Sequence, residues 1–319
     1  MKRIILALAA VICVNVVFTQ ERFTVRGLTY RVIRTKEVVV DECNKSASKI
    51  KIPSTVWQNF RKYNVTEIGF GAFDSIINVT TVVIPQSIIT IEAFAFYNCT
   101  KLSDFNIPTT VEYIGKEAFH NTAFYNNKYN WNNGALYKDN CLLTIDTSVK
   151  GTFIIPPTTK EIANGAFDNC KDLTSVVIPN NIKSIGSWTF AYCINLKSII
   201  IPNSVEYIHN GAFYDCESLT SIIIPDCIKH IEYYTFNECR SLDSITIPSN
   251  VEHIDFEAFI NCTNLKTITI LAQKPPILGL EVFPYPNNIT LLVPKGCKDK
   301  YINSNWDFYF NGRIKEINE

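Results

Sequence analysis

The most regular feature of the chain is an apolar and polar pattern that returns with a 23-residue period. In each copy a short alternating apolar run ends at Ile-Pro, a second apolar pair follows, and a phenylalanine and a cysteine come next. The phenylalanines keep this step, except for one longer interval between the second and the third: Phe96, Phe119, Phe167, Phe190, Phe213, Phe236 and Phe259. Periods of about 20 to 50 residues are typical of stacked solenoids, in which each unit buries its apolar face against its neighbours.

One unit illustrates the structure that this pattern predicts. Residues 173–178 alternate and predict a short inward-facing strand, which stops at Pro179 because proline has no N–H to extend a ladder. Ile182 and Ile185 predict a second short segment, and Phe190 leads into a tight helical or looped corner. The chain is therefore predicted to be a repeat solenoid of short parallel β-strands joined by tight corners.

The repeat also suggests how the chain is divided. Residues 1–19 have the charged start, apolar run and small residues of a signal peptide, and the apolar run is too short for the roughly 20 residues of a membrane-spanning helix. We expect the solenoid to cover residues 50–270, with one long variant unit at 108–155 that carries a protruding hairpin or loop. We expect no transmembrane segment in the mature chain.

The two ends outside the period are predicted to be caps, because an exposed end of a solenoid would be an open sheet edge. Residues 20–49 alternate around Gly27 and predict a β-hairpin over the first unit. Residues 271–319 start after the pattern stops and carry Tyr301 and Trp306, which suit a C-terminal cap.

These residues resemble the BspA-like family of leucine-rich repeat proteins. The resemblance rests on the unit at residues 201–225, on the variant unit that begins Gly134-Ala-Leu-Tyr-Lys, and on the opening at residues 23–30. It implies a solenoid of the leucine-rich-repeat type. It also implies a surface or secreted protein that binds host matrix proteins or other cells, with no catalytic residues to transfer.

Six cysteines share one position of the repeat: Cys99, Cys170, Cys193, Cys216, Cys239 and Cys262. Equivalent positions in stacked strands lie about 4.8 Å apart with parallel side chains, whereas a disulfide needs Cβ atoms nearer about 3.8 Å apart. We therefore interpret this column as buried, apolar thiols. The pairing of Cys43, Cys141, Cys227 and Cys297, which lie outside the column, stays open.

The outward positions of the strand column form a candidate partner-binding ridge. It consists of Val177, Ile200, Ile223, Thr246 and Thr269, one residue for each successive unit. A row of exposed β-branched apolar residues favours a binding or lateral assembly surface. The alternative is simple β-propensity, which favours these residue types on any sheet face.

Three of the four histidines fall close together in the repeat. His230 and His253 share one outward column, and His209, Glu232 and Asp255 share the column two residues on. Imidazoles and carboxylates in this arrangement suit Zn²⁺ or a pH-sensitive surface, and ordinary surface polarity is the third interpretation.

Composition excludes several functional classes. The 319 residues carry 30 basic and 30 acidic side chains, so the formal net charge of +0 gives no support to nucleic acid as a partner. The sequence has no phosphate-binding loop and no hydrolase motif, so we predict neither an enzyme nor a cofactor. The best interpretation is an extracellular or cell-surface protein that adheres to a protein or glycan. A host matrix protein is one candidate partner. The alternative is a self-assembling structural or antigenic coat protein.

Overall fold

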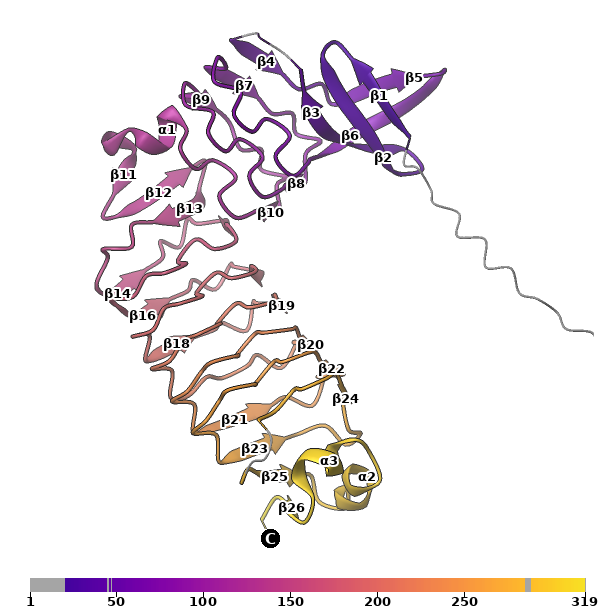
Figure 1. The fold of residues 1–319 in the computed structure, drawn as a ribbon, viewed down its shortest axis with the longest axis vertical. Helices are drawn as coiled ribbons and strands as arrows, with labels where there is room; N and C mark the ends of the chain where they lie inside the picture. Colours follow the sequence, from indigo (N-terminus) through magenta and orange to yellow (C-terminus); the bar gives the residue numbers. More distant parts are fainter. Residues whose placement is uncertain (1–20, 45, 47, 285–287, 319) are drawn as a thin grey trace, which may run out of the picture.

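The fold is an elongated, curved β-solenoid, seen here in a computed structural model that describes residues 21–44, 46, 48–284 and 288–318 (Figure 1). The successive coils stack along the long axis, and short strands recur on two sides of the stack. The leucine-rich-repeat solenoid predicted from the 23-residue period is confirmed. The predicted signal peptide, residues 1–19, lies outside the described residues.

Parallel ladders run along the first strand-bearing side of the solenoid. Its sheets contain β4 (Lys49–Lys51), β7 (Thr81–Val83) and β9 (Asp104–Phe105); β14 (Gly151–Ile154), β16 (Leu173–Val177) and β18 (Ser198–Ile200); and β21 (Ser244–Ile247), β23 (Thr267–Ile270), β25 (Thr290–Val293) and β26 (Ile314–Glu316). The register follows the repeat, because Ser175 lies beside Ser198 and Ser244 lies beside Thr267, one repeat further along in each case.

Shorter strands line the second strand-bearing side, where most are only two residues long. They are β8 (Thr90–Ile91), β10 (Tyr113–Ile114), β15 (Glu161–Ile162), β17 (Ser184–Ile185), β19 (Tyr207–Ile208), β20 (His230–Ile231), β22 (His253–Ile254) and β24 (Ile277–Leu278). Each ends in a buried apolar residue that points into the core.

The N-terminal region is an antiparallel meander joined to the solenoid. It contains β1 (Arg22–Val25), β2 (Leu28–Arg34), β3 (Glu37–Cys43), β5 (Thr55–Gln58) and β6 (Arg61–Ile68). The β1–β2 hairpin turns at Arg26 and Gly27, whose φ angles of 52° and 75° are those of a left-handed turn. Strand β3 pairs with β6 in parallel, and β8 and β10 follow β6 as the next strands of the same sheet. That this region acts as a cap stays a prediction.

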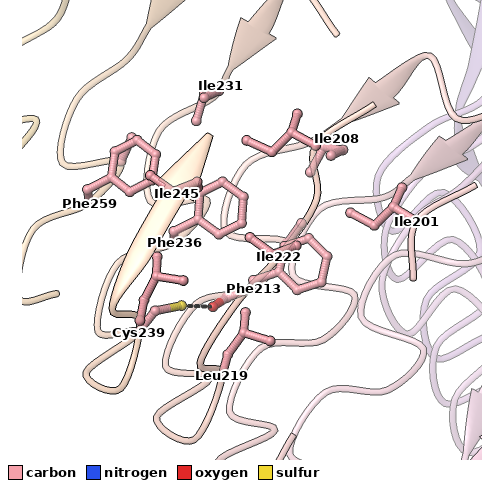
Figure 2. Close-up of a cluster of buried hydrophobic side chains, with 14 of the residues drawn as sticks. Ile201, Ile208, Phe213, Leu219, Ile222, Ile231, Phe236, Cys239, Ile245 and Phe259 are labelled. Atoms are coloured by element: carbon pink, nitrogen blue, oxygen red, sulfur yellow. Dashed lines mark hydrogen bonds between the residues drawn. The ribbon is translucent and has the colours of Figure 1, made fainter. Parts of the chain in front are cut away.

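The core is a column of stacked phenylalanine rings along the axis of the solenoid (Figure 2). The rings of Phe213, Phe236 and Phe259 lie nearly parallel, with centroids 5.6 and 5.3 Å apart. Beside them the Cys239 thiol donates a hydrogen bond to the Phe213 carbonyl oxygen at 3.3 Å (Figure 2). The cysteine column is thus a set of buried free thiols, and burial raises the pKa of the Cys239 thiol well above its usual value.

Turns, not helices, form the corners of the repeating units, so only the looped form of the predicted corner occurs there. The helical elements of the described residues lie elsewhere: α1 (Ala123–Asn126) and η1 (Lys128–Asn130) in the variant unit, and α2 (Lys298–Ile302) and α3 (Trp306–Phe310) near the C-terminus. Trp306 is fully buried there and donates its indole N–H to the Pro276 carbonyl oxygen at 2.8 Å. A capping role for residues 271–319 stays a prediction.

The long variant unit inserts a hairpin into the stack. Strands β11 (Trp131–Asn132), β12 (Ala135–Lys138) and β13 (Cys141–Ile145) pair antiparallel, and β13 joins β15 in parallel. Residues on the two sides of the insertion still meet, because the Asn164 N–H donates to the Ile114 carbonyl oxygen at 2.8 Å. Of the protruding hairpin or loop predicted for this unit, a hairpin is present, and it packs into the stack beside β15 (Figure 1).

Candidate binding surfaces

The first candidate site is the predicted ridge on the first strand-bearing side. Val177 and Ile200 are direct ladder partners, and their side chains are 45% and 78% exposed. Ile223 is 80% exposed and forms a single bridge to Thr246, which in turn pairs with Thr269. Thr246 is exposed, whereas Thr269 is only partly exposed. The structure therefore brings these five residues into two runs of paired positions, Val177 with Ile200 and then Ile223 with Thr246 and Thr269.

The exposed row begins one repeat earlier than the predicted ridge. Ile154 pairs with Val177, lies one repeat before it and is 66% exposed. The irregular unit that precedes it hid this position, although one more repeat step back from Val177 would have found it. Below, "the apolar ridge" means Ile154, Val177, Ile200 and Ile223.

The ladder under the apolar ridge is interrupted between its two most exposed members. Strand β18 is the last of its sheet, and residues 221–223 form no ladder with it in the described structure. On the second strand-bearing side, β19 and β20 likewise belong to different sheets. The corners remain joined at this step, since the Phe213 N–H donates to the Thr235 carbonyl oxygen at 2.9 Å. At this step the two coils are therefore joined by corner hydrogen bonds and not by strand pairing.

A cysteine occupies a bridging position at this same step. In the preceding unit the Ser204 hydroxyl donates to the Ile182 carbonyl oxygen at 2.7 Å, and Thr110 makes the equivalent bond to Ile88 at 2.8 Å. Cys227 takes this position and its thiol meets the Val205 carbonyl oxygen at 2.9 Å. Because a thiol is a weaker donor than a hydroxyl, the side-chain bridge is weakest where the strand pairing is missing.

The second candidate site is a groove of about 890 Å³ at this interrupted step, on the second strand-bearing side. His209, His230 and Glu232, all from the predicted histidine patch, line it together with Tyr207 and Cys227. Sequence reasoning did not predict the groove, because the missing strand pairs cannot be seen in a period that continues unchanged.

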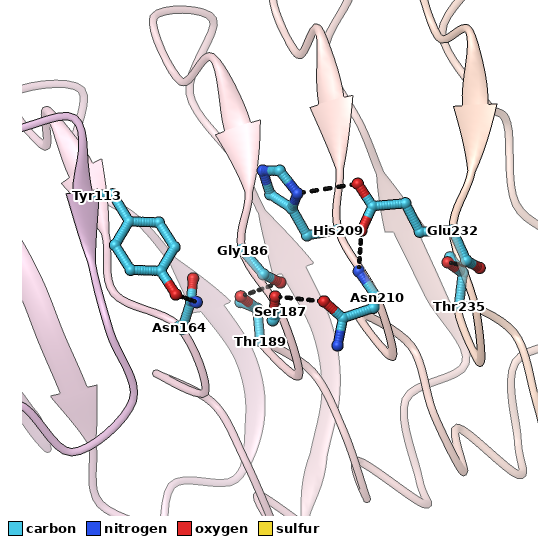
Figure 3. Close-up of polar contacts among 9 residues, drawn as sticks. All are labelled: Tyr113, Asn164, Gly186, Ser187, Thr189, His209, Asn210, Glu232 and Thr235. Atoms are coloured by element: carbon cyan, nitrogen blue, oxygen red, sulfur yellow. Dashed lines mark hydrogen bonds and ion pairs between the residues drawn. The ribbon is translucent and has the colours of Figure 1, made fainter. Parts of the chain in front are cut away.

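Glu232 organises this groove through two contacts (Figure 3). One carboxylate oxygen lies 3.1 Å from His209 Nδ1, and the other accepts the Asn210 backbone N–H at 2.8 Å. The rings of His230 and His253 are stacked, with centroids 4.9 Å apart and planes inclined by 6°. Asp255 is not among the residues that line the groove. The predicted patch is therefore split into an ion-pair-like contact and a ring stack.

This geometry does not supply a metal centre. Within the described ranges, no group of three or more histidine, cysteine, aspartate or glutamate side chains is placed to hold a metal ion. The zinc interpretation of His209, His230, Glu232, His253 and Asp255 therefore has no ligand cluster behind it. A pH-dependent role for the patch stays a prediction.

Cysteines outside the repeat column add little to these surfaces. Cys141, Cys227 and Cys297 are free thiols, and Cys43 is buried. Cys227 is the exposed member of this set, whereas burial raises the pKa of the Cys141 thiol to about 12. No helix in the described part of the chain is long and apolar enough to cross a membrane.

Comparison with solved structures returns leucine-rich repeat proteins of bacteria. A leucine-rich cell surface protein of Faecalibacterium prausnitzii is 22% identical and aligns over 86% of this chain and 76% of its own, with a TM-score of 0.38. The pneumococcal vaccine antigen PcpA is 16% identical over 93% of this chain and 97% of its own, with a TM-score of 0.45. A leucine-rich repeat protein of Bacteroides ovatus is 22% identical over 92% and 99%, with a TM-score of 0.33. No curated protein matches the sequence.

The family comparison is decisive for the repeat itself. The model of the BspA type leucine-rich repeat region matches residues 42–141 and 160–290, in six copies. The unmatched stretch, 142–159, covers the end of the long variant unit and the four residues after it. Because the match covers most of the sequence and agrees with the observed coils, this chain belongs to the BspA-type leucine-rich repeat family.

Proposed function

We propose that the protein is a non-catalytic binding protein, secreted or held at a cell surface, that adheres to an extracellular protein or glycan through the apolar ridge. A host matrix protein is the partner class that we favour. The observation that carries this proposal is the exposure of Ile154, Val177, Ile200 and Ile223, which runs from 45% to 80% on four successive coils. Such a contiguous exposed apolar surface is typical of interaction sites.

The energetics of this surface suit binding. Burying a fully exposed isoleucine side chain is worth about 1.5–3 kcal/mol, and four β-branched apolar side chains lie side by side. Ile154, Val177 and Ile200 stand on paired strands of the solenoid, so little backbone freedom is lost when a partner covers them. The flanking positions are polar, with exposed Ser198, Ser221 and Ser244 beside the ridge. An apolar centre with a polar rim is the usual anatomy of a protein interface.

The proposed location rests on the predicted signal peptide at residues 1–19, and one protein of similar fold offers a parallel. The Faecalibacterium protein is described as a cell surface protein, and we extend that location to this chain as part of the proposal. The absence of recognisable catalytic motifs in the sequence supports a non-catalytic role. Binding in this family of folds uses extended outer surfaces rather than enclosed active sites.

The second candidate function is lateral self-assembly into a structural or antigenic coat. The same observation favours it, because a row of β-branched residues on a flat sheet face also fits a second copy of itself. The two functions differ in what covers the apolar ridge, so one set of variants tests both.

The experiment is chemical crosslinking of purified residues 20–319 to intact cells and matrix, with mass spectrometry of the captured proteins. The variant pair is Ile200→Lys and Ile223→Lys, which place charges in the apolar ridge. The control is Ile277→Lys, since Ile277 is 63% exposed on the second strand-bearing side. Adhesion predicts saturable capture of one matrix or surface protein, lost in the ridge variants and kept in the control.

The self-assembly alternative predicts a different result for the same proteins. The mass measured by light scattering would rise with concentration, and the ridge variants would abolish this rise. Capture of nothing but the protein itself would contradict adhesion. Capture that survives both ridge substitutions would show that another surface binds.

A further inference from the structure

The interruption of the phenylalanine column creates a cavity in the solenoid. Phe96 and Phe119 stack with centroids 5.2 Å apart, and Phe167 and Phe190 lie 4.9 Å apart. Phe119 and Phe167 make no ring contact with each other in the described structure. Phe105 stacks on Phe119, Phe153 contacts Phe167, and the hairpin β12–β13 lies between the two coils. A cavity of about 400 Å³ opens there.

The backbone explains why this cavity stays open. Successive corners are normally joined, as where the Phe96 N–H donates to the Ala118 carbonyl oxygen at 2.7 Å. The corner at residues 115–120 makes no such bond to the corner at 163–169 among the described residues. Instead the Ile145 N–H of the hairpin donates to the Ala166 carbonyl oxygen at 2.9 Å. The hairpin therefore lies between the backbones of the two corners, and the Lys116–Asp168 pair bridges them through side chains.

Aromatic side chains form one wall of the cavity. The rings of His120 and Tyr125 have centroids 4.5 Å apart, and those of Tyr125 and Trp131 lie 5.3 Å apart at 84°. The Trp131 indole N–H donates to the Tyr125 carbonyl oxygen at 2.7 Å, and Thr122 caps the short helix α1 that carries Tyr125. These contacts fix the rings before any ligand arrives, which lowers the entropic cost of binding.

The lining of the cavity also carries an excess of carboxylates. Glu117, Asp146 and Asp168 line the cavity with a single lysine, Lys116. The Lys116 ammonium lies 2.5 Å from one oxygen of Asp168, while the other oxygen, Oδ1, is buried and has no hydrogen-bond partner. Hydrogen bonds from Ser148 hold the pKa of Asp146 below its usual range. The lining therefore carries two carboxylates in excess of its single lysine.

Asn164 braces the floor of the same cavity. Its side-chain amide donates to the Tyr113 hydroxyl at 2.9 Å across the insertion (Figure 3). Asn164 is 6% exposed, so this bond ties together the two coils that flank the hairpin. The cavity is thus built on packed elements of the solenoid and not on a loose loop.

We propose that this cavity binds the cationic side chain, arginine or lysine, of a protein partner. An organic cation between aromatic rings and carboxylates gains both cation–π and charge-assisted contacts. An anionic ligand would meet three carboxylates, and a neutral sugar would leave their charge uncompensated. The volume lies within the roughly 300–1,000 Å³ range of small-ligand sites. This inference rests on the proposed protein-binding function and adds a specificity site that lies apart from the apolar ridge.

The first test uses fluorine NMR of the whole protein labelled with 5-fluorotryptophan. Four tryptophans give four signals, of which Trp131 reports on the cavity and Trp57, Trp188 and Trp306 serve as internal controls. The Trp131→Phe variant assigns the signal. The probes are Nα-acetyl-arginine methylamide and its lysine counterpart, and the matched neutral probe is the citrulline derivative.

The expected result is a saturable shift of the Trp131 signal with the cationic probes and none with citrulline. Asp168→Asn should weaken the binding about ten-fold or more, because it removes a charge-assisted contact. Glu117→Gln is a second, exposed variant that should weaken it in the same direction. Asp172→Asn, on an exposed carboxylate outside the cavity, should leave it unchanged.

Three outcomes would overturn the inference. No shift at the solubility limit of the cationic probes would exclude the site, and an equal response to citrulline would exclude recognition of charge. Binding of free arginine but not of its capped derivative would identify a free amino acid, not a protein side chain, as the ligand. Ile200→Lys should not alter the Trp131 response, so failure of the ridge and failure of the cavity can be told apart.

Discussion

The regular coils and the variant unit differ in how well each fills its own core. From Phe167 to Phe283 consecutive rings lie 4.9 to 5.6 Å apart without a gap. Across the variant unit the column stops at Phe119, a hairpin takes its place and a cavity remains. Strict repetition therefore produces an unbroken column of stacked rings, whereas the departure from the period interrupts that column and leaves a cavity between the coils.

A second comparison is between successive coils of the regular region, most of which pair through their strands and two of which do not. The two coils that carry Ile200 and Ile223 keep their corner bonds to each other but lack strand pairing between them on both strand-bearing sides. The sequence period does not change at this step. Regular spacing is therefore sufficient for stacking but does not guarantee an unbroken ladder.

The largest expected loss of stability comes from removing one phenylalanine ring from the regular coils and one from the border of the variant unit. Phe213 is stacked on both faces and fully buried, so Phe213→Ala should cost about 3–5 kcal/mol of unfolding free energy. Phe119 stacks with Phe96 and Phe105 but also borders the cavity, so Phe119→Ala should cost roughly 1 kcal/mol less. Urea denaturation followed by circular dichroism measures both. Equal losses of unfolding free energy in the two variants would show that Phe119 is packed as tightly as Phe213 despite the neighbouring cavity.

An intermediate effect is expected at Glu161, on β15 beside the inserted hairpin. Burial raises the pKa of this carboxyl from 4.5 to about 8. Between these values the folded state holds a proton that the unfolded state has lost, so stability falls as the pH rises through this window. The slope is at most about 1.4 kcal/mol per pH unit. Glu161→Gln should therefore stabilise the protein increasingly from pH 4.5 to 8.

The measurement is the urea midpoint of both proteins at several pH values across that window. Glu112→Gln, on an exposed neighbouring carboxylate, is the control and should not reproduce the effect. Parallel pH profiles for Glu161→Gln and the unchanged protein would contradict the raised pKa. At pH values below 4.5 the two proteins should differ little.

The smallest effect concerns the interrupted step. Cys227→Ser replaces a weak thiol donor to the Val205 carbonyl oxygen by a hydroxyl, as in Ser204, and should stabilise the protein by about 0.5 kcal/mol. The reverse change, Ser204→Cys, should destabilise it by a similar amount. Thermal denaturation of the pair measures both. If Cys227→Ser lowered the stability, or Ser204→Cys raised it, the side-chain bridge would not be what stabilises this step.

Much of the fold could be predicted because the repeat puts the same side chain at the same place in every coil. Phe213, Cys239 and the inward isoleucines occupy the expected core, and Val177 and Ile200 pair in the expected register. Ile154 was missed because the irregular unit before it obscured the constant step of the repeat. The cavity was missed because its walls, Trp131 and Asp168, come from segments with no common period.

The sequence by itself determined the solenoid, its register, the buried thiols and the outward ridge, because each depends on residues separated by a constant step. Tertiary structure alone decided where the ladder breaks, how the histidine patch divides and where carboxylates and aromatic rings enclose a space. Those features depend on how the inserted hairpin lies between two corners and on weak bonds between adjacent coils. Such contacts follow from three-dimensional packing, which a one-dimensional period does not encode.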